Sequence, residues 1–177
     1  MSDQVARRAR PARSARPADQ GPSDATIVSR FRCAFLALAG GIALGAAVEL
    51  ATLRHWDGVQ LVPWGIIACL VCASLLAWRR PGRTSTIVAW LAGLIGVVGS
   101  GAGVVVHVAS NVKTGGLDAT YADRWGQMSA LQHWWLAATG GVGPSPPLAP
   151  GFLAVSAICL ILGTLWLRSP DISRNRP

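Results

Sequence analysis

Few polar side chains that could do chemistry lie within the apolar part of this sequence, and two regular series contain most of them. Each series has a spacing of four residues: Gly41, Gly45 and Glu49 in the first, and Gly99, Gly103, His107 and Asn111 in the second. Residues four apart share one face of a helix, and glycines on that face let another helix approach closely. We therefore predict that Glu49 and His107 face each other across one helix–helix interface, with Asn111 one turn beyond His107.

Three interpretations of Glu49 are open at this point. An ionisable side chain inside a membrane span is costly and usually faces a partner or a cavity. Glu49 is either a structural polar lock between helices, an interfacial residue that pairs with Arg54 or His55, or a ligand, ion or proton site. A carboxylate beside an imidazole favours the protonated imidazole. In the predicted pair, Glu49 and His107 would face each other, and neither group would then meet lipid.

The remaining chemistry-bearing residues match no recognised site. Cys69 and Cys72 have the spacing of a redox or metal motif, but they lie in an apolar stretch, and a thiol in such surroundings is inert. His55, His107 and His133 do not have the spacing of metal ligands. Neither a nucleophile motif nor a phosphate-binding glycine loop is visible. The sequence therefore predicts no catalytic residue, no metal and no cofactor.

Four long apolar stretches must position these side chains, at residues 31–53, 61–78, 87–108 and 148–167. A helix of about 20 residues crosses a hydrocarbon core of about 30 Å. None of the four stretches has the polar face of a helix at the surface of a soluble protein. We therefore predict an all-α fold, a four-helix transmembrane bundle.

The charge of the chain is segregated. The formal net charge is +8, yet only 14% of the residues are charged, against roughly 25% in an average soluble domain. This composition excludes an ordinary soluble enzyme. The basic residues do not interleave with aromatic residues along a folded segment, so we expect no nucleic-acid partner. Arginines gather before the first apolar stretch, at residues 79–83 and near the C-terminus. Because basic residues concentrate on the cytoplasmic side, we predict that both termini are cytoplasmic.

The chain divides into one membrane domain and two tails. Residues 1–25 contain little to bury, which predicts a disordered basic cytoplasmic tail; this tail is either a topology signal alone or a segment attracted to anionic lipid. Residues 26–168 form the four-span domain, and residues 169–177 form a short cytoplasmic tail. A single Lys beside fifteen Arg, with abundant Ala and Gly, indicates a GC-rich bacterial genome. The expected location is therefore the bacterial plasma membrane.

Two short amphipathic helices are predicted in the long outer loop. The first has Leu117, Tyr121 and Trp125 on one face, and the second has Ser129 and Gln132 as a capping box followed by Trp134 and Trp135. These outer-face aromatic residues form either the usual interfacial belt or a cap that binds a partner or covers a ligand. The Pro-rich stretch 143–151 follows, and we expect a rigid connection there because proline lacks an amide donor.

The C-terminal part combines His107-x-x-x-Asn111, Trp125, an amphipathic stretch, Gly141 and the motif Pro-Leu-Ala-Pro-Gly at residues 147–151. In these features residues 107–177 resemble a group of small bacterial four-helix integral membrane proteins to which no activity is assigned. In that group, acidic and aromatic residues follow the Asn closely, whereas residues 112–116 here are Val-Lys-Thr-Gly-Gly. The resemblance implies a shared fold and an outward-facing site near His107 and Asn111, and it implies no reaction.

These observations predict a non-enzymatic integral membrane protein, an accessory or assembly component. Its partners would be the lipid bilayer and either a larger membrane protein or further copies of the chain. The alternative is a small oligomeric transporter or proton-coupled carrier that uses Glu49 and His107. A third class, a membrane redox enzyme, would need a bound haem or quinone.

Overall fold

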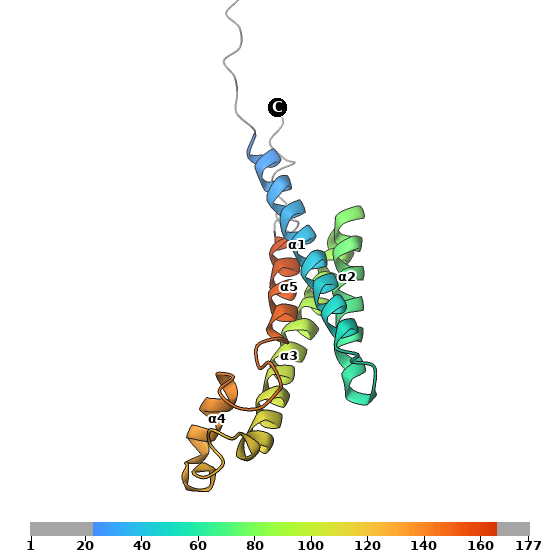
Figure 1. Ribbon diagram of the computed structural model, residues 1–177. Coiled ribbons are helices and arrows are strands. Elements are labelled where there is room, and N and C mark those ends of the chain that lie inside the picture. Colours follow the sequence, from blue (N-terminus) through green and yellow to red (C-terminus); the bar gives the residue numbers. More distant parts are fainter. Residues whose placement is uncertain (1–22, 166–177) are drawn as a thin grey trace, which may run out of the picture.

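The computed structural model describes residues 23–165, and this part of the chain is helical throughout, without a strand. Its α-helices are α1 (Asp24–Thr52), α2 (Val62–Arg79), α3 (Arg83–Thr114), α4 (Ala130–Ala138) and α5 (Gly151–Leu162) (Figure 1). The loops contain the 3-10 helices η1 (Gly58–Leu61), η2 (Gly115–Leu117) and η3 (Trp125–Gln127). The predicted all-α fold class is confirmed.

Three helical segments are long and apolar enough to cross a membrane: α1, α2 together with η1, and α3 together with η2. Two of them run well beyond the predicted spans. α1 begins at Asp24 because Ser23 caps it, with its side chain accepting a hydrogen bond from the Thr26 N–H. The predicted tail boundary at residue 25 therefore falls inside α1. α3 has 32 residues and ends only at the pair Gly115 and Gly116.

The helix in the fourth predicted span is shorter than expected. α5 has 12 residues, a length of about 18 Å, whereas a hydrocarbon core is about 30 Å thick. The helix begins after Pro150 and ends at Gly163, which packs against Leu36 of α1. Residues 166 and 167 of the predicted span, residues 1–22 of the N-terminal tail and the whole C-terminal tail lie outside the described residues.

α5 also determines which helices meet. α1 packs against α2 and α5, and α3 packs against the same two helices. α2 and α5 contact each other as well, so α1 and α3 lie at opposite corners of the group. The interface predicted between the first and third spans is therefore not a main interface of the fold.

The packed helices have two different ends (Figure 1). The start of α1, the turn between α2 and α3 and the end of α5 lie at one end, and α4 lies at the other. At the first end, the Arg32 guanidinium of α1 donates a hydrogen bond to the Ala77 carbonyl in the last turn of α2. A cation there is favourable because a helix C-terminus carries partial negative charge.

Small side chains allow the helices to pack closely. Buried alanines line the contacts, among them Ala39, Ala77 and Ala157. The Ser156 hydroxyl of α5 donates to the Ala39 carbonyl of α1 at 2.7 Å. Small residues and short polar bonds of this kind are typical of helix contacts in membranes, where lipid provides no hydrophobic drive between helices.

Candidate functional site

The polar side chains of α3 hold the segment that connects α4 to α5. This segment, residues 140–150, is called the strap; it is not helical and runs beside the C-terminal half of α3 (Figure 1). Ser100, His107 and Asn111 each bond a backbone carbonyl of the strap. The structure thus brings His107 and Asn111 together at one site, and their common partner is the strap.

Asn111 is fully buried and uses both ends of its amide. Its Nδ2 donates to the Ser145 carbonyl at 2.7 Å and to the Ala137 carbonyl at 3.4 Å, and its Oδ1 accepts from the Ser145 N–H at 3.0 Å. Gly143 passes so close that a Cβ there would overlap the Asn111 side chain, and its φ is +80°. A left-handed residue of this kind is best served by glycine.

His107 bonds the next carbonyl of the strap. Its Nδ1 lies 2.9 Å from the Pro146 carbonyl oxygen. Because a carbonyl oxygen can only accept, Nδ1 must be the nitrogen that donates in this hydrogen bond. The ring is only half-buried, so Nε2 does not need a protein partner.

Ser100 holds the end of the strap through a hydrogen bond to the Pro150 carbonyl. Ser100 lies eight residues before Val108, where the third apolar stretch was expected to end, which corresponds to about 12 Å along the helix. Backbone outside a helix is tolerated at membrane depth only where protein or water satisfies its polar groups. The prolines of the strap remove N–H donors, and α3 supplies donors to three of its carbonyls.

Glu49 is not part of this site. It is exposed near the end of α1, and in the described residues no hydrogen bond or ion pair joins it to His107, Arg54 or His55. The reason is the helix arrangement, since α1 and α3 lie at opposite corners. The expectation that Glu49 and His107 face each other is therefore not what the structure has.

The two glycine series differ in their surroundings. A Cβ on Gly99 would meet Ile66 of α2, and one on Gly103 would meet Pro150 of the strap. A Cβ on Gly41 or Gly45 would meet nothing within 4 Å. The first series therefore lies on an open face of α1, whereas the second lies in helix and strap contacts.

The loop before the strap folds into a small cap, residues 115–139. Its second predicted helix forms as α4, with the capping box of Ser129 and Gln132 as expected. Its first predicted helix does not form, because Asp118 accepts from the Thr120 N–H and starts a turn. Trp125 instead packs on the two glycines after α3 and stacks on His133 with ring centroids 4.0 Å apart.

The other aromatic residues of the cap are less buried. Tyr121 is half-buried and packs in the small cluster around Val108. Trp134 and Trp135 are exposed, at 44% and 68% of their surface. No group of three His, Cys, Asp or Glu side chains suited to a metal ion occurs between residues 23 and 165, and the four cysteines are free.

Comparison with protein-family models, curated proteins and solved structures finds no match. The site therefore rests on its own geometry. Sequence reasoning missed Ser100 and Ser145 as members of it. The sequence does contain a signal for them. Four prolines lie within residues 140–150, and the carbonyls of such a segment need hydrogen-bond donors from elsewhere, which polar side chains of α3 can provide.

Proposed function

We propose that this chain is a non-enzymatic integral protein of the bacterial plasma membrane, with both termini cytoplasmic, and that it serves as an accessory or assembly component of a larger membrane protein. Three long apolar helices support membrane insertion. The polar side chains of α3 are engaged with the strap, which supports a structural role for them rather than a carrier role.

The observation that carries the proposal is an open face of α1. This α1 face consists of Ala37, Gly41, Gly45 and Glu49, which are all exposed. Neither glycine has a neighbour where a side chain would begin. A face of small residues favours close approach of another membrane helix, and within the described chain no helix covers it.

Glu49 supports the same interpretation. A carboxylate that faces hydrocarbon is unfavourable, although less so near a helix end than at the bilayer centre. Glu49 lies three residues before the end of α1. A partner helix with a cation or hydrogen-bond donor at that depth would pair with it and would cover the glycines in the same contact.

The test compares two glycines of α1 with one glycine of α3, and a Cβ at any of the three would meet open space. The double variant Gly41→Leu, Gly45→Leu fills the α1 face, and Gly101→Leu on α3 is the matched control because open space also surrounds Gly101. The tagged full chain is purified in mild detergent and its stoichiometric partners are quantified by mass spectrometry. We expect recovery of a larger membrane protein to fall by about tenfold or more in the double variant, equivalent to ~1.4 kcal/mol, and to be unchanged in the control.

Two results would contradict the proposal. Equal recovery of the partner with the double variant would show that the α1 face is not the contact. Recovery of further copies of this chain alone would favour the oligomeric carrier over the accessory component.

A further inference from the structure

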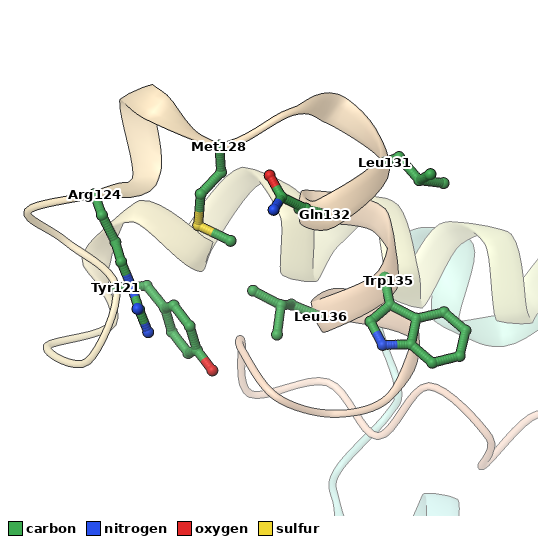
Figure 2. A pocket seen from close by; sticks show the side chains of 7 residues that line it. All are labelled: Tyr121, Arg124, Met128, Leu131, Gln132, Trp135 and Leu136. Carbon is green, nitrogen blue, oxygen red and sulfur yellow. The ribbon is translucent and has the colours of Figure 1, made fainter.

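The cap carries an open groove of about 570 Å³, which neither the strap nor the α1 face uses (Figure 2). Arg124 and Tyr121 stand at one end of the groove and Trp135 at the other. Met128 and Leu136 line the stretch between them. The groove is therefore amphipathic along its length, with a cation at one end and apolar walls beyond it.

The cation has an aromatic neighbour and no ion-pair partner among the described residues. The Arg124 guanidinium lies over the Tyr121 ring, with its Cζ 4.7 Å from the ring centroid. Within residues 23–165 no carboxylate forms an ion pair with it. Gln132 accepts from Ser129 through its oxygen, and its nitrogen lies on the groove side (Figure 2). An anion at the Arg124 end would meet the N–H donors of the guanidinium, whose fork suits a phosphate, and the Gln132 amide lies farther along the groove (Figure 2).

The apolar end of the groove is the end nearer the membrane helices. Trp135 lies two residues before Ala137, whose carbonyl bonds Asn111. Arg124 directly precedes Trp125, which packs on the glycines beyond the tip of α3. Gly115 lies about 10 Å beyond Val108 along the helix axis, and a headgroup layer is roughly 5–8 Å thick on each side. With Val108 as the end of the hydrocarbon core, the backbone of Arg124 therefore lies slightly beyond the headgroup layer, and its long side chain can reach back.

Two apolar side chains of the groove wall are largely exposed, which is unfavourable in water. Leu131 and Trp135, which both line the groove, are 79% and 68% exposed. Exposed apolar side chains next to a cation are typical of surfaces that lie in the interfacial layer of a membrane. The order along the groove, apolar near the membrane and cationic farther out, matches the order of a phospholipid from acyl chain to phosphate.

We propose that this groove holds an anionic phospholipid of the leaflet on the cap side. Its phosphate would lie against Arg124, and an acyl chain would follow Leu136 and Trp135 toward the packed helices. The lipid would bind the outer part of the cap to the membrane, as the strap binds the inner part to α3.

The test measures lipid retention by the full chain. The protein is reconstituted in nanodiscs of phosphatidylcholine with one quarter phosphatidylglycerol, transferred to mild detergent, and analysed by native mass spectrometry. We expect one retained phosphatidylglycerol per chain. Arg124→Gln should lower its retention by about tenfold or more, because hydrogen bonds to charged groups are the strong ones. Arg54→Gln removes the same charge from an exposed position after α1 and should leave retention unchanged.

Three other outcomes would contradict the proposal. Equal retention of phosphatidylcholine would show that charge is not recognised, and equal loss in both Arg variants would show a general charge effect. Displacement of the lipid by millimolar soluble glycerol phosphate would show that the groove binds free phosphate instead.

Trp fluorescence during thermal unfolding checks that Arg124→Gln folds like the unchanged protein, and Trp135→Gln provides a second variant that keeps the cation and removes the apolar wall.

Discussion

At the scale of single residues, three polar side chains of α3 donate hydrogen bonds to the strap, those of Ser100, His107 and Asn111. Asn111 is the clearest case, because it is fully buried and its amide bonds three backbone groups. The sequence pattern placed His107 and Asn111 on one face and toward one end, as the structure has them. It did not show their partner, because the spacing of side chains on one helix carries no information about which segment covers it.

We expect the substitution Asn111→Asp to destabilise the protein although it changes neither size nor shape. The carboxylate can still accept from the Ser145 N–H, but it places an acceptor against the Ser145 and Ala137 carbonyls. Losing two donors in a buried place should lower the free energy of unfolding by about 3 kcal/mol or more. The measurement is unfolding in mild detergent with increasing dodecyl sulfate, followed by Trp fluorescence.

Ser110→Ala is the control for this substitution. Ser110 is exposed on the adjacent position of α3, so its change should stay within about 0.5 kcal/mol. Equal stability of Asn111→Asp and Ser110→Ala would mean that the strap is held without the amide.

At the scale of elements, the strap determines where α5 begins. Its prolines delay the start of the helix until Gly151, and Gly143 allows the chain to pass over Asn111. The hydropathy pattern alone predicted a 20-residue span over 148–167, because it registers apolar side chains and not the missing N–H groups of proline. α5 nevertheless lies centrally, in contact with α1, α2 and α3.

Two glycines of the strap separate backbone conformation from packing. Gly140 and Gly143 have φ values of +75° and +80°, but a Cβ meets open space at Gly140 and the Asn111 side chain at Gly143. Gly140→Ala should therefore lower the free energy of unfolding by about 1–2 kcal/mol, because of the left-handed conformation alone. Gly143→Ala should lose a further 1–3 kcal/mol, roughly, from overpacking. Equal losses in the same unfolding assay would show that the strap does not press on Asn111.

At the scale of the whole molecule, the two ends of the packed helices differ in charge and content. The turn between α2 and α3 carries Arg79, Arg80 and Arg83, whereas the opposite end carries the cap. Basic residues concentrate on the cytoplasmic side of a membrane. The proposed orientation therefore places the cap outside.

Thiol labelling of intact cells tests this orientation. In a chain whose four cysteines are replaced by alanine, a membrane-impermeant reagent should modify Thr120→Cys in the cap. It should modify Pro81→Cys, in the turn between α2 and α3, only after the cells are opened. Both residues are exposed, so access differs only by side of the membrane. Labelling of Pro81→Cys in intact cells would reverse the orientation.

The sequence by itself determined the features that depend on local chemistry. Long apolar runs predicted four helices of membrane length because lipid offers no partner for an open backbone, and three of the four reach that length. Ser129 with Gln132 marked the start of α4 because both groups belong to one helical turn. Tertiary structure alone decided which faces meet. α5 separates α1 from α3, so Glu49 and His107 do not pair, and Trp125 packs on Gly115 rather than continuing a helix. These outcomes depend on contacts between distant segments, and residue spacing along one segment does not encode them.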